Sequence, residues 1–343
     1  MMARKKKVSM QDIADQLNIS KNAVSLALLN KKGVSEEMRS RVMQTAKELG
    51  YGEFAGKTPG NGGGNILVLV PERIMSYEDN DHFQFYHDMI WGLEKVIRKK
   101  GMNAVIAPID REMESRLELP RHCSDIVYQG IILFGIVDNA YAKVVWELDT
   151  PLVMLDSYYR DLPCPVVTSA NIEGAWEAVS VLIGAGHRDI GFIGPTNLTT
   201  SHEERWFGYW KAMHEHGLKI EDRFTLTSSQ SFDHTEEEIG SFLEGLSMLP
   251  SAFFCGNDRI AYLLARQLRK RHGDGSAEIS IVGFDGLKYE ELGGLNITTM
   301  SVEKEKMCDA AAKLLLSLSG PNRERVRVYV PPTLRHGNSV RER

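Results

Sequence analysis

The chain has few cysteines and no long apolar run, and these two features limit the classes of protein to which it can belong. Its cysteines are far apart and form no Cys-x-x-Cys pair; they are Cys123, Cys164, Cys255 and Cys308. This spacing argues against a zinc site or a disulfide framework and favours the reduced thiols of a cytoplasm. No apolar stretch approaches the about 20 residues that a membrane-spanning helix needs, and no apolar segment follows the basic residues 1–7. We therefore predict a cytoplasmic protein without a secretion signal.

Catalytic motifs are missing as well. The sequence contains no HExxH, no GxSxG, no Walker motif and no GxGxxG after a strand. Its ten histidines show no metal-ligand spacing. The Gly-rich residues 60–64 precede an apolar run instead of following one, which excludes a phosphate-binding loop. We expect no catalytic residue, no metal and no cofactor, and hence no enzyme.

Charge is distributed unevenly along the 343 residues. Residues 1–52 hold ten Lys or Arg and five Asp or Glu, a net charge of +5. The rest of the chain therefore carries −10, because the whole chain carries −5. A basic head on an acidic body is typical of a DNA-binding module joined to a domain that does not bind DNA.

The basic head can be drawn as three short helices. Ser9, with Asp12 three residues on, would cap the first helix, Ser20 the second and Ser35 the third. The inward positions at helical spacing are Ile13, Ala14, Leu17, Ala23, Val24, Ala27, Leu28, Met38, Val42, Ala46 and Leu49. Two helices joined by a few residues, the second opening with small polar side chains, predict a helix-turn-helix.

The start of the second helix would read DNA bases. In this motif the N-terminal end of that helix reaches base edges in the major groove. Lysine can donate to guanine and asparagine can pair with adenine, so Lys21 and Asn22 are the expected base readers. Leu26, one turn later on the same side, could contact a thymine methyl group or cover the sugar edge. Phosphate contacts are expected from Ser20 (which would also cap the helix), Ser25, Asn30, Lys31 and Arg39.

A linker and an α/β body follow the head. Residues 53–64 are rich in Gly, include Pro59 and lack an apolar period. From Ile66 onward, short apolar runs alternate with amphipathic stretches, which predicts parallel sheets with helices on both faces and enough chain for two sheets. The strands are expected at 66–70, 104–107, 130–134, 152–155, 166–168, 190–193, 252–255, 279–284, 297–300 and 326–330. The main helices are expected at 83–100, 140–148, 171–185, 203–216, 235–246, 258–271 and 303–319.

Specific residues of both parts resemble the lactose-repressor (LacI/GalR) family of bacterial transcription regulators. In the head the resemblance is carried by Ile13-Ala14, Ile19-Ser20-Lys21, Ala23-Val24-Ser25, Asn30, Val34-Ser35-Glu36-Glu37, Arg39 and Leu49-Gly50-Tyr51. In the body it is carried by Gly92-Leu93-Glu94, Gly101, Gly130-Ile131-Ile132, Asn171, Gly174-Ala175, Gly186-His187-Arg188, Ile190, Arg205, Gly208, Asn257-Asp258, Ala261, Ser280 to Asp285 and Thr298-Thr299. The family usually has a hinge helix with an Ala-Arg-x-Leu signature after the head, and that signature is missing here.

The resemblance implies a domain plan. Residues 1–52 would form the helix-turn-helix headpiece, 53–64 an atypical hinge, and 65–343 a two-lobed, periplasmic-binding-protein-like domain that binds ligand and dimerises. Three crossovers would join the lobes. One lobe would comprise about 66–165 plus 297–321, and the other about 166–296 plus the C-terminal strand.

The ligand is expected between the lobes. Ligands bind outside the carboxyl ends of parallel strands, where Asn257 and Asp258 lie at a strand end and a helix start. In the family the residues matching Arg205 and Asp258 contact the effector, and an Arg with an Asp can hold neighbouring hydroxyls of a sugar. The other expected pocket residues are Tyr77, Phe83, Phe85, Phe284 and Asp285. The family often has Asp-Asn where this chain has Ala170-Asn171, which suggests a changed ligand.

The function predicted from these features is a sequence-specific transcriptional regulator, by family analogy a repressor, controlled by a sugar-like effector. Its expected partners are a pseudo-palindromic operator, the effector and a second copy of itself, without a membrane. The alternative is a sugar sensor whose headpiece binds DNA weakly or not at all, which the missing hinge signature motivates.

Overall fold

A computed structural model describes residues 9–28, 34–49, 64–75, 83–273, 278–289, 294–318, 320 and 324–343. The chain forms two compact units, residues 1–61 and 62–343. Three sequence-based expectations, those for Asn30, Lys31 and Tyr77, lie outside the described residues, as does most of the linker.

The first unit is the expected bundle of three helices, α1 (Met10–Leu17), α2 (Lys21–Leu28) and α3 (Glu36–Leu49). Ser9 and Asp12 form a reciprocal capping box at the start of α1, and Asn18 ends the helix in the left-handed conformation. The core consists of residues predicted to face inward, namely Ile13, Ala14, Val24, Ala27, Val42 and Ala46. Burial of this small stripe from each helix is what holds so short a bundle together.

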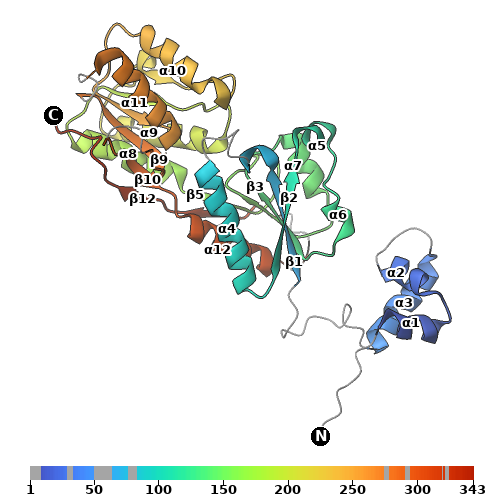
Figure 1. Cartoon of the computed structure of the whole chain (residues 1–343). Helices are drawn as coiled ribbons and strands as arrows, with labels where there is room; N and C mark the ends of the chain where they lie inside the picture. Colours follow the sequence, from blue (N-terminus) through green and yellow to red (C-terminus); the bar gives the residue numbers. More distant parts are fainter. Residues whose placement is uncertain are drawn as a thin grey trace. The chain divides into compact units, whose positions relative to one another are not determined.

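The second unit contains two six-stranded sheets. The first sheet has the order β11-β5-β4-β3-β1-β2, and all its pairs are parallel. Its strands are β1 (Asn65–Pro71), β2 (Asn103–Ile109), β3 (Gly130–Phe134), β4 (Leu152–Leu155), β5 (Val166–Ser169) and β11 (Arg327–Val330). Helices α4 (Phe83–Lys99) and α12 (Lys304–Ser317) cover one face, and α5 (Arg111–Arg116), α6 (His122–Asp125) and α7 (Asn139–Trp146) the other (Figure 1). We call this part the first lobe.

The second sheet forms the second lobe, with the order β12-β10-β9-β8-β6-β7. Its strands are β6 (Ile190–Ile193), β7 (Thr225–Leu226), β8 (Ala252–Cys255), β9 (Ser280–Asp285), β10 (Thr298–Ser301) and β12 (Thr333–Arg335). Only β12 runs antiparallel to its neighbour among these described strands. Helices α8 (Asn171–Gly184) and α9 (Thr200–Glu215) pack on one face, and α10 (Thr235–Glu244) and α11 (Asp258–His272) on the other (Figure 1).

The expected division of the strands between the lobes was wrong in three places. β5 and β11 belong to the first sheet, where β11 pairs with β5, and β10 belongs to the second sheet beside β9. The short strand β12, which the sequence did not predict, is the C-terminal strand that joins the second lobe. The chain therefore crosses between the lobes after β5, after β10 and after β11. Three crossovers were expected, but each lies one strand later than the sequence pattern suggested.

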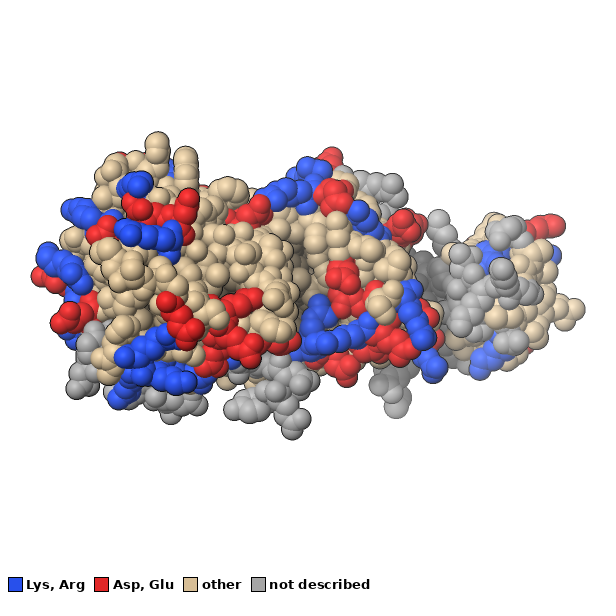
Figure 2. Space-filling view, turned by 90° about the horizontal axis from the view of Figure 1, so that it is seen from above, with Lys and Arg blue, Asp and Glu red and all other residues tan. Residues whose placement is uncertain are grey.

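The surface of the molecule carries charges of both signs. Figure 2 shows basic and acidic side chains intermingled on the visible face of the body, without a broad area of one sign. No helix within the described residues is long and apolar enough to cross a membrane.

Candidate effector cavity and DNA-reading helix

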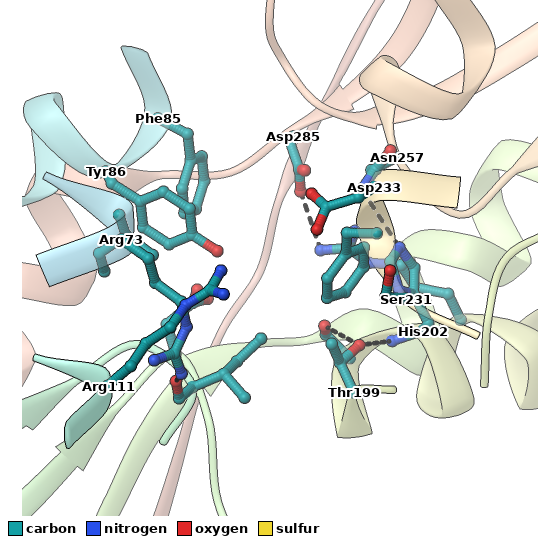
Figure 3. Close-up of a pocket in the computed structure, with 16 residues that line it drawn as sticks. Arg73, Phe85, Tyr86, Arg111, Thr199, His202, Ser231, Asp233, Asn257 and Asp285 are labelled. Carbon is teal, nitrogen blue, oxygen red and sulfur yellow. Dashed lines mark hydrogen bonds and ion pairs between the residues drawn. The ribbon is translucent and has the colours of Figure 1, made fainter. Parts of the chain in front are cut away.

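A cavity of about 330 Å³ lies between the two lobes (Figure 3). Both lobes contribute to its lining, which consists of Arg73, Ile74, Phe85, Tyr86, Arg111, Ile136, Asp156, Thr199, Ser201, His202, Arg205, Ser231, Phe232, Asp233, Asn257 and Asp285. Its volume is at the lower end of the range of small-molecule sites, about 300–1,000 Å³. Aromatic side chains together with a few charged and hydroxyl groups are the usual lining of such sites.

Arg205 is the most heavily bonded side chain of the cavity. Its Nε donates to Asn171 Oδ1 (3.0 Å), its Nη1 to the carbonyl oxygen of Gly256 (2.6 Å) and its Nη2 lies 2.9 Å from Asp285 Oδ1. The guanidinium carbon lies 3.8 Å from the centre of the Phe284 ring. Bonds along every edge of the guanidinium hold it in one orientation, so Arg205 presents a preorganised surface to the cavity.

Close packing of two helices places Arg205. Gly208, one turn further along α9, lies against α8, and a Cβ added there would be 2.3 Å from the carbonyl oxygen of Ile172. This approach brings Asn171 of α8 within reach of both Arg205 and Glu204. Asn171 Nδ2 donates to Glu204 Oε2 (2.9 Å), and Tyr158 of the first lobe donates to Glu204 Oε1 (2.5 Å). The family often has an acid at the position of Ala170, directly before Asn171. In this chain the carboxylate that bonds to Asn171 comes instead from Glu204 of α9.

Asp258 has a different place from the expected one. Its side chain is fully buried and is not part of the cavity lining. Its Oδ2 accepts a hydrogen bond from the backbone N–H of Leu287 (2.7 Å), which holds the turn that follows β9. Burial, and then the nearby charge of Asp285, raise the pKa of Asp258 well above its ordinary value. Asp258 therefore supports the loop behind Asp285 and does not face a ligand in this structure.

Asn257 combines a structural and a cavity position. Its side-chain oxygen accepts from the N–H of Ile260 (2.9 Å), so Asn257, and not Asp258, caps helix α11. Its Nδ2 lies 3.2 Å from His202 Nε2, and both residues line the cavity. In Figure 3 they stand on the second-lobe wall with Thr199, Ser231 and Asp233.

The aromatic candidates divide into lining and packing residues. Phe85 lines the cavity, as does its neighbour Tyr86, and the two rings meet edge to face 5.4 Å apart. Phe83 does not line it and instead packs on His87. Phe284 lies beneath Arg205 and is fully buried, so it supports the arginine without forming part of the lining.

Several lining residues were not predicted from the sequence, among them Arg73, Arg111, Asp156, Thr199, His202, Ser231 and Asp233. Part of the signal was available, since Arg73, Arg111 and Asp156 follow the carboxyl ends of β1, β2 and β4. Asp156 adopts a left-handed backbone with φ +71°. Burial raises the pKa of Asp156 to about 7, with a further contribution from the charge of Asp285.

Helix α2, which the sequence predicts to read DNA, is capped at its N-terminal end. Ser20 Oγ accepts from the N–H of Ala23 (3.1 Å), so the cap expected at Ser20 is present. Lys21 is exposed and Leu26 partly exposed. Arg39 of α3 places its Nη1 3.5 Å from the carbonyl oxygen of Ala27, near the end of α2. The side chains of Asn22 and Ser25 lie outside what the structure describes.

Comparison with known proteins finds a matching family model for each of the two parts. A model of the bacterial regulatory proteins of the lacI family matches residues 9–52, and a model of the periplasmic binding protein-like domain matches residues 179–340. The chain belongs to the lacI family. As a lacI-family member it combines a helix-turn-helix headpiece with a two-lobed α/β domain, as the sequence predicted.

Relatives align with this lacI-family protein over nearly their whole length. The transcriptional regulator RegA of Clostridium saccharobutylicum is 28% identical over 314 residues, 90% of this chain and 92% of RegA. The transcriptional repressor CytR of Escherichia coli K12 is 26% identical over 322 residues, 92% of each chain. Both relatives are named as regulators of transcription, which fits the expectation of a protein that is not an enzyme.

Solved structures share the fold of this lacI-family protein. A complex of the regulator CelR with cellobiose has a TM-score of 0.67 at 21% identity and covers 97% of this chain and 100% of CelR. A lac repressor dimer bound to its operator has a TM-score of 0.66 at 17% identity and covers 98% and 100%. These structural likenesses establish the architecture of the chain. The cellobiose and the operator are ligands of CelR and of the lac repressor.

Proposed function

We propose that this lacI-family protein is a sequence-specific transcriptional repressor whose hold on its operator is set by a small polar effector in the interlobe cavity. The observation that carries the proposal is the presence, in one chain, of a capped helix-turn-helix and a cavity lined by both lobes. A sensor that did not bind DNA would have no use for a headpiece core of this kind, and the relatives named above are regulators.

Two copies of the chain are needed for useful affinity. One headpiece reads only a few base pairs, so a dimer on a pseudo-palindromic site in cytoplasmic DNA is the functional unit. The lac repressor, with the same fold, is a dimer on its operator.

Ligand control follows from the crossovers. The lobes are joined at three points, between β5 and α8, between β10 and α12, and between β11 and β12. A ligand that touches both walls stabilises one angle between the lobes over others and so changes the state of the dimer. Sugar-like effectors suit the aromatic and hydroxyl groups of the lining, and structural relatives hold cellobiose or ribose.

The first test is selection of random duplex DNA by the purified full-length protein at physiological salt. We expect one enriched pseudo-palindrome, bound at nanomolar concentration and with an affinity that falls steeply as salt rises. Candidate sugars would then be added to the complex to measure release. Salt-dependent binding without any enriched sequence would contradict the proposal, because basic adhesion alone produces that result.

A further inference from the structure

Two arginines stand together on the first-lobe wall of the cavity. Arg73 lies in the short helix Glu72–Ile74 after β1, and Arg111 is the first residue of α5 after β2. β1 and β2 are neighbouring parallel strands in which Pro71 pairs with Ile109, so each arginine follows the paired residues by two positions. Both side chains line the cavity and appear on the same wall in Figure 3. The register thus brings two positive charges to one edge of one sheet.

The charge of Arg73 is already balanced. Its Nη1 lies 2.5 Å from Glu114 Oε2 and its Nη2 3.3 Å from Glu114 Oε1, and Nη2 also donates to the carbonyl oxygen of Ile136. Glu114 is buried and accepts a further bond from the N–H of Asp138 (2.6 Å). Arg73 is therefore a positioned donor whose orientation is set before a ligand arrives.

The charge of Arg111 is not balanced within the described residues. Arg111 is exposed to the cavity and makes no hydrogen bond or ion pair with any residue that the structure describes. On the opposite wall the charge of Arg205 is taken by Asp285. Burial raises the pKa of Asp156, in the same lining, to about 7, so near neutral pH this carboxyl group carries less negative charge than an exposed aspartate does. The first-lobe wall is left with an excess of positive charge.

The second-lobe wall offers groups that suit hydroxyls. Thr199, Ser201, Ser231 and Asn257 present neutral hydrogen-bonding groups, and Asp233 is an exposed carboxylate that can accept from sugar hydroxyls. Phe85 and Phe232 supply apolar surface for the faces of a sugar ring.

We propose that the effector is a sugar acid, a monosaccharide with one carboxylate, bound with its carboxylate on Arg111 and Arg73 and its hydroxyls on the second-lobe wall. The proposal rests on the cavity being the effector site. A carboxylate matches the planar fork of a guanidinium. One unbalanced arginine suits a single negative charge better than the nearly double charge of a phosphate monoester.

The test is calorimetric titration of the full-length protein with matched ligands. The panel contains glucuronate, galacturonate and gluconate, the neutral sugars glucose and galactose, and glucose 6-phosphate. We expect at least one acid to bind about tenfold or more tightly than its neutral parent, equivalent to about 1.4 kcal/mol. Binding of that acid should also weaken with salt, and glucose 6-phosphate should bind less tightly.

Two variants separate charge recognition from folding. Arg111→Gln should lower the affinity for the acid about tenfold or more and leave that for the neutral parent unchanged, because only the carboxylate contact is lost. Arg116→Gln, on the same helix, removes an exposed arginine paired with Glu112 and should leave both affinities unchanged. Arg73→Gln is a poorer variant, since it would leave Glu114 buried without its partner.

Three results would overturn the sugar acid. They are equal affinity for acid and neutral parent, tighter binding of the phosphate, and binding of no acid in the panel. None of these results would contradict the proposed function as a transcriptional regulator. That proposal is tested separately, by whether the DNA selection enriches an operator. A neutral sugar that released the operator would confirm regulation and reject the acid.

Discussion

Arg205 and Asp285 form a buried ion pair across the cavity wall, with 2.9 Å between Nη2 and Oδ1 and only 6% and 8% of their side chains exposed. The pair joins helix α9 to the end of β9. Asp285 holds a left-handed backbone with φ +103°, followed by Gly286 at φ +79°. The turn after β9 and the arginine of α9 therefore depend on each other.

Removal of Arg205 should lower the free energy of unfolding by more than the net contribution of the Arg205–Asp285 ion pair. Arg205→Met leaves Asp285 buried without a counter-charge, and we expect a loss of about 3–5 kcal/mol in the free energy of unfolding. Arg205→Met combined with Asp285→Asn should recover part of that loss, because the stranded charge is gone. Urea unfolding of the single and double variants measures both. Equal stability of the two variants would mean that the ion pair carries little of the effect.

Asp156 should make stability depend on pH. Burial raises its pKa in the folded protein to about 7, so the folded state holds the proton more tightly than the unfolded chain does. The resulting stabilisation is present at low pH and is lost as the pH rises from about 4 to about 7. Asp156→Asn tolerates the left-handed backbone and removes the titration.

The measurement is urea unfolding of the wild type and Asp156→Asn at pH 5 and pH 8. The variant should gain stability relative to the wild type at pH 8 and not at pH 5. Taking the difference between the two proteins removes the contribution of Asp258, whose pKa is also raised. A constant difference at both pH values would show that Asp156 titrates normally.

Gly208 should be required for the contact between α8 and α9. Gly208→Ala would place a Cβ 2.3 Å from the carbonyl oxygen of Ile172 and 2.6 Å from the Cβ of Ala175. Because the backbone of α8 has to move, we expect the free energy of unfolding to fall by about 1–3 kcal/mol. The matched control is Gly184→Ala at the end of α8, where a Cβ meets nothing within 4 Å. That change should be neutral or stabilising by up to about 1 kcal/mol. Thermal unfolding distinguishes them, and equal effects would exclude the packing explanation.

Lys21 should contribute to base preference. It is exposed at the start of α2, beside the capped end of the helix. Lys21→Ala should weaken binding to the selected operator by about 1–3 kcal/mol. It should change the affinity for random DNA much less. Lys219→Ala removes an exposed lysine from the body and serves as the charge-matched control. A uniform loss on both DNAs would make Lys21 a phosphate contact instead.

Local pattern alone determined much of this protein. The three headpiece helices, their caps at Ser9 and Ser20 and their inward residues follow from helical spacing and side-chain capping, which act within a few residues. The alternation of strands and helices in the body follows equally from short-range periodicity. The resemblance to the lacI family also rested on residues visible in the chain.

Tertiary structure decided which segments distant in sequence pair, bury one another or come into contact. The pattern of β5, β10 and β11 shows that each is a strand, but only long-range pairing chooses the sheet that each joins. Asp258 looked like a ligand contact because it follows a strand, and burial behind the turn after β9 removed it from the cavity lining. Arg73 and Arg111 lie far apart in sequence, and the register of β1 with β2 makes them neighbours. Charge recognition in the cavity is therefore a product of strand pairing, because a single arginine in a sequence does not reveal which charges surround it.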